Sequence, residues 1–123
     1  MSKNIIVVDD DEDILNIIEL ILVEAGYHVR AVSDIVSFYN IHEFKPDLIL
    51  LDDWLADGYG SKLCLDLKRN PLTSNIPVIL ISAKNDLPNI SRNCLADDFI
   101  SKPFDLDFFT EKINNWLLSV LPK

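Results

Sequence analysis

The sequence predicts an α/β fold in which five parallel strands alternate with five helices, a (βα)5 pattern. Short, wholly apolar runs at residues 5–8, 48–51 and 78–81 are rich in isoleucine, valine and leucine. Stretches with apolar residues at helical spacing separate these runs. Because the runs do not alternate with polar residues, we expect strands that are buried on both faces, as in a parallel sheet between two layers of helices.

The first half of the chain contains three predicted strands and two predicted helices. Residues 3–8 and 27–32 form the first two strands, and residues 48–51 form the third. Asp11 is a suitable N-cap for the first helix, and Ser33 or Asp34 caps a short second helix that ends before Pro46. The apolar stripe expected on the first helix comprises Ile14, Ile17, Ile18, Ile21 and Ala25.

The second half continues the alternation to the end of the chain. Residues 54–60 are expected to form a loop, since they include two of the three glycines, and residues 61–69 form a helix. Residues 78–81 form the fourth strand, a weak helix begins near Pro88, and residues 99–100 form a short fifth strand. The stripe expected on the last helix comprises Leu106, Phe109, Ile113, Trp116 and Val120.

Right-handed crossovers between these strands favour a doubly wound sheet with the flavodoxin-like strand order 2-1-3-4-5. The 123 residues suit one domain over 1–123. Twenty acidic against eleven basic residues disfavour nucleic acid or an anionic membrane as a partner of this domain. With no membrane-length apolar run, no signal-peptide core and two cysteines expected as free thiols, we expect a cytoplasmic protein without membrane insertion.

Polar residues gather where the predicted strands end. Asp9 and Asp10 follow the first strand, Asp52 and Asp53 the third, Ser82 the fourth, and Lys102 the fifth. The expected strand order brings Asp52 between the first acid pair and Ser82, with Lys102 reaching in from beyond the fourth strand.

This group of side chains suggests phosphoryl chemistry. Carboxylates this close require a cation, and an all-oxygen ligand set favours Mg²⁺. A carboxylate can accept a phosphoryl group as a nucleophile, while a hydroxyl and an ammonium hold the phosphoryl oxygens that the metal leaves free. The geometry expected from the sequence therefore points to an aspartyl-phosphate site.

Four motifs together make the chain resemble the receiver domain of two-component response regulators. They are IIVVDDD at 5–11, DLILLD at 47–52, PVILISA at 77–83 and ADDFISKPF at 96–104. They follow the order found in the family and cover essentially the whole chain. The resemblance implies a phosphorylatable receiver that promotes its own phosphorylation and dephosphorylation rather than turning over a separate substrate.

The resemblance also implies roles for particular residues. Asp52 matches the phospho-acceptor, because the loop glycine of the family comes eight residues later, at Gly60. Asp9 and Asp10 match the acid pair that binds Mg²⁺, with Asp10 the more direct ligand, and the backbone carbonyl of Trp54 would complete the protein ligands. Ser82 matches the conformational hydroxyl of the family, and Lys102 matches the lysine that contacts the phosphoryl group. Phe99 matches the aromatic switch.

The implied partners are a phosphohistidine donor and a downstream protein. The donor would be a histidine kinase or a histidine phosphotransfer protein. The downstream protein would bind the face formed by the fourth helix, the fifth strand and the fifth helix. Mg²⁺ is the only cofactor implied.

Some positions depart from the family pattern. Asp53 is an extra acid beside the acceptor, expected to be a solvated loop residue, and Leu95 stands where a glycine is common. Trp54 and Lys84 border the path of the hydrolytic water in this family. We expect Trp54 to shield the phosphoryl group and Lys84 to approach its oxygens, with Trp54 packing on the loop as the alternative.

Two other functions fit the same fold less well. A pseudo-receiver that binds partners without phosphoryl chemistry would not need the complete set of Asp10, Asp52, Ser82 and Lys102. A phosphatase of the haloacid-dehalogenase type would want an acid two residues after its nucleophile, where this chain has Trp54.

Overall fold

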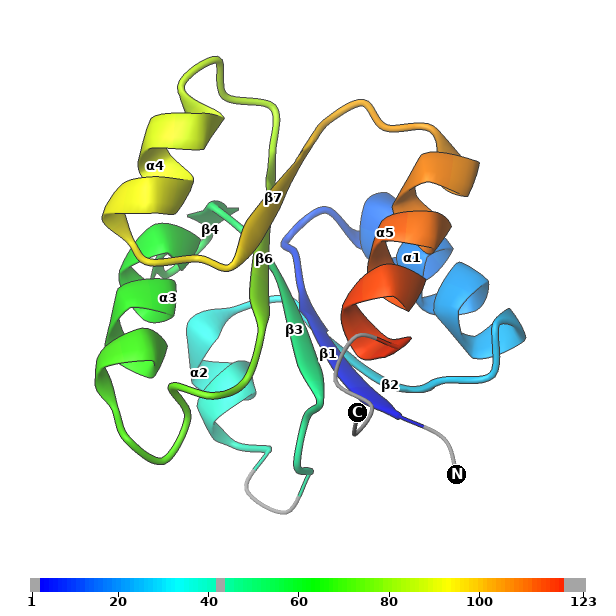
Figure 1. The fold of residues 1–123 in the computed structure, drawn as a ribbon, viewed down its shortest axis with the longest axis horizontal. Coiled ribbons are helices and arrows are strands. Elements are labelled where there is room, and N and C mark those ends of the chain that lie inside the picture. Colours follow the sequence, from blue (N-terminus) through cyan, green and yellow to red (C-terminus); the bar gives the residue numbers. More distant parts are fainter. Residues whose placement is uncertain (1–2, 42–43, 119–123) are drawn as a thin grey trace.

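A five-stranded parallel sheet forms the centre of the molecule (Figure 1). The computed structural model describes residues 3–41 and 44–118. The sheet order is β2-β1-β3-β6-β7, which corresponds to the predicted order 2-1-3-4-5 and confirms it. The strands are β1 (Asn4–Val8), β2 (His28–Val32), β3 (Leu48–Asp52), β6 (Val78–Ser82) and β7 (Asp98–Ser101).

Helices cover both faces of this sheet (Figure 1). On one face lie α1 (Glu12–Glu24) and α5 (Leu106–Leu118). The other face carries α2 (Ile35–Tyr39), α3 (Gly60–Arg69) and α4 (Leu87–Asn93). The result is the predicted three-layer, doubly wound architecture.

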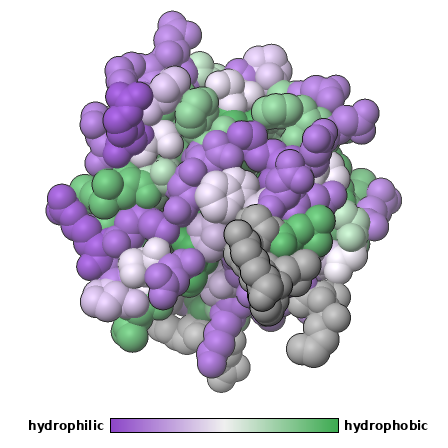
Figure 2. Space-filling model, in the orientation of Figure 1, coloured by the Kyte–Doolittle hydropathy of each residue, from purple (hydrophilic) through white to green (hydrophobic). Residues whose placement is uncertain are grey.

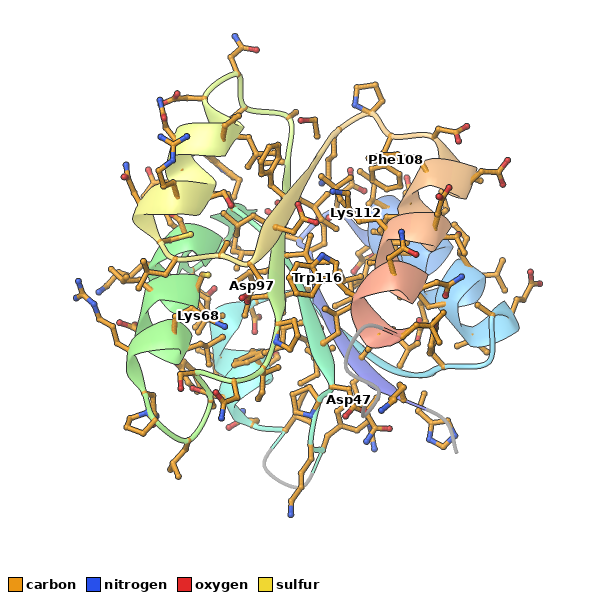
Figure 3. The ribbon with its side chains drawn as sticks, in the orientation of Figure 1. Asp47, Lys68, Asp97, Phe108, Lys112 and Trp116 are labelled. Carbon is orange, nitrogen blue, oxygen red and sulfur yellow. The ribbon has the colours of Figure 1, made fainter. Side chains whose placement is uncertain are left out.

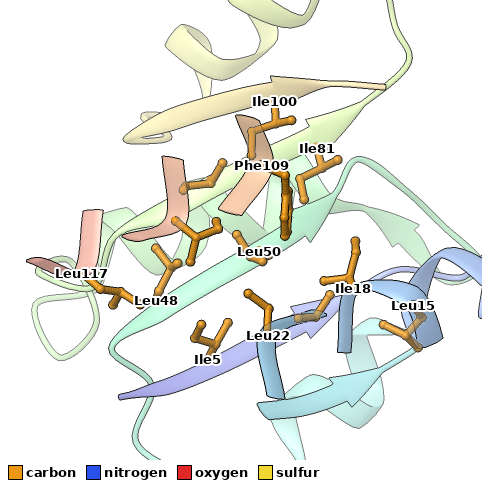
Figure 4. Packing of buried hydrophobic residues seen from close by; sticks show 13 residues of the cluster. Ile5, Leu15, Ile18, Leu22, Leu48, Leu50, Ile81, Ile100, Phe109 and Leu117 are labelled. Atoms are coloured by element: carbon orange, nitrogen blue, oxygen red, sulfur yellow. The ribbon is translucent and has the colours of Figure 1, made fainter. Parts of the chain in front are cut away.

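Alternate residues of each central strand supply the two halves of the core. Ile5 and Val7 of β1 face α1 and α5, whereas Ile6 and Val8 face the other helices. Figure 4 shows Phe109 of α5 beside residues of β6 and β7 in the first of these clusters. Each large aliphatic side chain buried in this way stabilises the fold by about 1.5–3 kcal/mol, so the strand backbones are held firmly in place.

The structure corrects the predicted faces of the first and last helices. On α1 the buried side chains are Leu15, Ile18 and Leu22, while Ile17 is half exposed. Because α1 is apolar on more than one side, several stripes fit its sequence, and only packing against the sheet selects one.

The α5 stripe is confirmed in part, since the predicted Phe109 and Ile113 are buried and the predicted Trp116 packs against the same cluster. Its buried residues are Phe109, Ile113 and Leu117, whereas Leu106 is half exposed. The predicted Val120 lies outside the described residues. Leu106 is the first residue of α5, before the helix has reached the sheet-facing turns that carry Phe109 and Ile113.

Side-chain caps start two helices as expected. The Asp11 carboxylate accepts hydrogen bonds from the backbone N–H groups of Asp13 and Ile14 at 3.1 and 3.3 Å. Of the two candidates for the second helix, Asp34 is the cap, and its side chain accepts the N–H of Ser37 at 2.7 Å. These acceptors satisfy N–H groups that have no partner within the helix.

Residues 54–60 contain more regular structure than the predicted loop. Trp54–Leu55 (β4) and Gly58–Tyr59 (β5) pair as a short antiparallel hairpin, and Gly60 already belongs to α3. Gly58 adopts a φ of +155°, a conformation that side chains rarely tolerate, which explains why a glycine follows the turn.

The surface is mixed in character. In Figure 2, hydrophilic and hydrophobic residues are interspersed across the visible face. Within residues 3–41 and 44–118, no helix combines the length and apolarity that crossing a membrane requires.

Leu95, which follows the C-cap of α4, provides a test of this backbone geometry. Its φ is +66°, in the left-handed region, and its side chain is half exposed. That conformation costs a side-chain-bearing residue about 1–2 kcal/mol. Glycine avoids this cost, but it makes the unfolded chain more flexible, which lowers the stability of the fold by about 0.4–1 kcal/mol. We therefore expect Leu95→Gly to raise the free energy of unfolding by about 0.5–1 kcal/mol, measured by urea denaturation.

The matched control for this prediction is Leu95→Ala. Alanine removes most of the side chain but keeps the Cβ that makes the conformation unfavourable, so no gain is expected. A Leu95→Gly protein no more stable than Leu95→Ala would contradict the argument.

Candidate functional site

Three aspartates meet at the carboxyl ends of β1 and β3. The register pairs Val8 with Leu51, so the next residues, Asp9 and Asp52, are neighbours across the sheet. One carboxylate oxygen from each of Asp9, Asp10 and Asp52 lies within 4.8 Å of the others. Asp9 and Asp52 are buried, whereas Asp10 is exposed. Two negative charges are therefore held close together in a poorly solvated position.

Lys102 places a positive charge between the two buried acids. Its Nζ donates to Asp9 Oδ2 at 3.0 Å and to Asp52 Oδ1 at 3.3 Å. The Lys102 backbone N–H donates to the Ser82 carbonyl at 2.9 Å, which continues the pairing of β6 with β7. Lys102 thus reaches past β6 from the edge of the sheet, as the sequence predicted.

The titration behaviour of the site reflects this crowding. Burial, followed by the Asp9 charge, raises the pKa of Asp52 to about 6, although Lys102 opposes the shift. Burial disfavours the Lys102 ammonium, but the hydrogen bond that it donates to Asp9 and the charges of both acids outweigh this effect and raise the Lys102 pKa. One lysine therefore leaves excess negative charge among three carboxylates, which suits a further cation.

A pocket of about 430 Å³ opens over the three acids. Ser82 lines it and is buried, and its Oγ accepts the backbone N–H of Lys84 at 3.2 Å. The complete lining is Asp9, Asp10, Asp11, Asp52, Trp54, Ser82, Ala83, Lys84 and Lys102. The pocket therefore brings a carboxylate, a hydroxyl and an ammonium together around a space open to solvent.

Gly60 lets the start of α3 approach the end of β3. A Cβ at this position would lie 2.0 Å from the carbonyl oxygen of Asp52, too close for any other residue without backbone movement. The Gly60 N–H donates to the carbonyl of Asp53 at 2.8 Å. The glycine eight residues after Asp52 thus helps to fix the backbone that carries the acid cluster.

Asp53 is not the solvated loop acid that the sequence predicted. Only 1% of its surface is exposed, and its carboxylate accepts the Ser61 N–H and the Lys84 ammonium, each at 2.8 Å. Burial alone would raise the pKa of Asp53, but these hydrogen bonds lower it below its usual range. Asp53 directly follows β3, and its carboxylate is bonded to the start of α3 and to Lys84 rather than to Lys102, which joins Asp9 and Asp52.

The Lys84 ammonium rests between the buried acid and two aromatic rings. It lies 5.0 Å from the Trp54 ring centroid and 5.1 Å from that of Tyr59. The two rings contact each other edge to face, with centroids 5.7 Å apart. Trp54 is mostly exposed and packs on its own hairpin while still lining the pocket.

The predicted site residues therefore fall into two groups. The structure brings Asp9, Asp10, Asp52, Ser82 and Lys102 together, with Trp54 at the rim. Phe99 is half buried in the core beneath α3 and α4, and the buried thiols Cys64 and Cys94 belong to the same core. The ion pair between Asp53 and Lys84 was missed, although strand alternation in Asp52–Asp53 was a signal for it.

Comparison with known sequences identifies relatives of the whole domain. A family model described as "Response regulator receiver domain" matches residues 5–114. The phosphate regulon transcriptional regulatory protein PhoB of Pseudomonas aeruginosa is 39% identical over 85% of the chain. The regulator RpaA of Synechocystis is 34% identical over 84%. The chain spans about half the length of these curated relatives, 47% and 44% respectively.

Solved structures give the same picture. A CheY-like receiver domain protein from Methanospirillum hungatei is 30% identical, with a TM-score of 0.86 over 97% of this chain and 96% of that one. The receiver domain of the sensor histidine kinase PA1611 from Pseudomonas aeruginosa is 26% identical, with a TM-score of 0.81 over 95% of this chain and 98% of that one. The latter structure has a magnesium ion coordinated in its active-site cleft.

The crowding of the three acids predicts a stabilising effect of divalent cations. A ligand that binds only the folded state adds about 2.7 kcal/mol at a hundredfold excess over its dissociation constant. We therefore expect millimolar Mg²⁺ to raise the melting temperature of the wild type. Asp10→Asn should lose most of this effect, yet without metal be no less stable than wild type, because a repelling charge is gone.

Thermal melts of both proteins, with Mg²⁺ and with a chelator, measure these effects. Glu111→Gln on α5 serves as a control that changes charge by the same amount elsewhere. A wild-type melt that is indifferent to Mg²⁺ would count against a metal site here.

Proposed function

The chain belongs to the response regulator receiver-domain family, and from this premise we propose that Asp52 accepts a phosphoryl group from a phosphohistidine donor. The observation that carries the proposal is the position of Asp52, buried between Asp9 and Lys102 at the floor of an open pocket. Asp53, the only competing acid in the same strand end, faces Lys84 instead. The donor would be a histidine kinase or a histidine phosphotransfer protein.

The donor set of the pocket fits Mg²⁺. Asp9, Asp10 and Asp52 offer carboxylate oxygens within 4.8 Å of one another, and the Trp54 backbone carbonyl is the further protein ligand proposed. Hard oxygen ligands of this kind suit Mg²⁺ better than softer metals. When bound, the ion would neutralise charge on the phosphoryl oxygens.

The side chains around Asp52 supply the rest of the chemistry. A carboxylate oxygen of Asp52 forms a bond to phosphorus as the phosphorus–nitrogen bond of the donor breaks, and the donor, protonated on its other ring nitrogen, leaves as a neutral histidine. Lys102, already within hydrogen-bond distance of Asp52, would shift to the phosphoryl oxygens once that acid has become an acyl phosphate. The buried Ser82 hydroxyl would donate to the same oxygens.

We propose that phosphorylation regulates a downstream protein through the face formed by α4, β7 and α5. On this face Asp98 accepts hydrogen bonds from Lys112 and the Trp116 indole at 2.9 and 2.8 Å. The half-exposed ring of Phe108 lies 5.5 Å from the Lys112 ammonium (Figure 3). Phe99 of β7 connects this face to the core, in keeping with the aromatic switch that we propose for it.

Phosphorylation with a small donor tests the acceptor directly. We expect acetyl phosphate or phosphoramidate with Mg²⁺ to add one phosphoryl group to the wild type, detected by intact mass. Asp52→Asn should abolish the modification, because an amide oxygen is a poor nucleophile.

Asp53→Asn is the matched control, since it removes the neighbouring acid. It should still be modified when Mg²⁺ is saturating. Full modification of Asp52→Asn with loss in Asp53→Asn would move the acceptor by one residue and defeat the assignment. Continuous release of phosphate by the wild type would indicate a phosphatase instead. A wild type that is not modified at all would indicate a binding module without phosphoryl chemistry.

The indole of Trp54 generates a prediction about the lifetime of the phosphorylated state. It is large and mostly apolar, it lines the pocket, and it has no carboxylate or amide to orient a water. We expect Trp54→Asn to dephosphorylate faster than the wild type, on the order of several-fold, because a polar side chain can position the attacking water. Trp54→Phe, which keeps an apolar ring, should decay close to the wild-type rate. Unchanged or slower decay in Trp54→Asn would show that the indole does not guard the bond.

A further inference from the structure

A second lysine stands at the rim of the acid pocket without joining the acids. Lys84 lines the same pocket as Asp9, Asp10 and Asp52, yet its ammonium is bonded to Asp53 on the other side of the strand end. Among the described residues, Lys102 is the one lysine bonded to this cluster, and it contacts Asp9 and Asp52 but not Asp10, so the three carboxylates attract a further mobile cation. A lysine on a flexible four-carbon stem that lines the same pocket is such a cation.

Several contacts keep Lys84 where it is. Asp53 is almost completely buried, and its other carboxylate oxygen is fixed by the Ser61 N–H at the start of α3. If Lys84 left, Asp53 would remain a buried charge with its cation missing, which is strongly unfavourable. The Trp54 and Tyr59 rings add cation–π contacts to the ammonium.

From this arrangement we propose that Asp53 is a positioning residue that holds the Lys84 ammonium out of the Asp9–Asp10–Asp52 cluster and so keeps that cluster open to a divalent cation. The proposal rests on the metal-dependent function proposed above. It assigns to Asp53 an effect on metal affinity that passes through Lys84, without contact between Asp53 and the metal.

A simpler explanation makes a different quantitative prediction. Asp53 and Lys84 are charges near the pocket, so removing either could change cation affinity through space alone. In that case Asp53→Asn would weaken Mg²⁺ binding by the same factor whether residue 84 is lysine or methionine. If Asp53 acts by restraining Lys84, its removal matters only while the lysine is present.

A double-mutant cycle separates these explanations. The proteins are the wild type, Asp53→Asn, Lys84→Met and the double variant, and the measurement is the Mg²⁺ dissociation constant from calorimetric titration. Methionine keeps an unbranched apolar stem against the two rings but has no charge. Thermal melts in the presence of chelator check that each variant is folded.

We expect Asp53→Asn to bind Mg²⁺ on the order of tenfold more weakly, because the released ammonium competes for the carboxylates. Lys84→Met and the double variant should both stay within about twofold of the wild type. Recovery of binding in the double variant also excludes misfolding as the cause, because that protein carries the same Asn at position 53.

Equal weakening by Asp53→Asn in both backgrounds would overturn the proposal, and so would wild-type affinity in Asp53→Asn. The proposed function fails separately. If the wild type binds no Mg²⁺, both the metal-dependent function and this inference are wrong. If the wild type binds Mg²⁺ tightly but the effects of the two substitutions are additive, only the inference is wrong.

Discussion

The repulsion between the Asp9 and Asp52 carboxylates is the constraint on which the rest of the site depends. Both side chains are buried, and their strands are fixed in register by backbone pairing and by apolar packing on both faces. The two acids therefore cannot move apart to relieve the repulsion. Positive charge has to come to them, and Lys102 supplies it from the far edge of the sheet, while Gly60 lets α3 begin against the same strand end.

The two lysines near the pocket show how the environment separates similar side chains. Lys102 contacts both acids of the cluster and is largely buried. Lys84 is one-third exposed and is bonded to Asp53, the residue that directly follows β3 and whose other oxygen accepts the Ser61 N–H of α3. Alternation along a single strand end, from Asp52 to Asp53, is enough to create two distinct ion pairs only one residue apart.

The strand positions and their order could be predicted from the sequence, because wholly apolar runs with acids at their ends leave few arrangements. The set of residues in the acid pocket followed from that order. The faces of α1 and α5 could be predicted only in part, since helices apolar on several sides fit more than one stripe, and contact with the sheet decides between them. The Asp53–Lys84 pair was missed because both residues lie just beyond the ends of their strands, and their meeting depends on how the β6–α4 loop turns back toward β3 rather than on the strand order.

The strand order also leaves β2 and β7 as the two outer strands, each paired with a single neighbouring strand among the described residues. Exposed edges of this kind are templates for cross-chain pairing and aggregation. On β2, His28 and Arg30 are exposed, and Arg30 lies over the Phe44 ring. β7 is only four residues long and begins at Asp98, which is bonded to Lys112. Short length and charged side chains thus protect a very apolar sheet against edge-to-edge growth into fibrils.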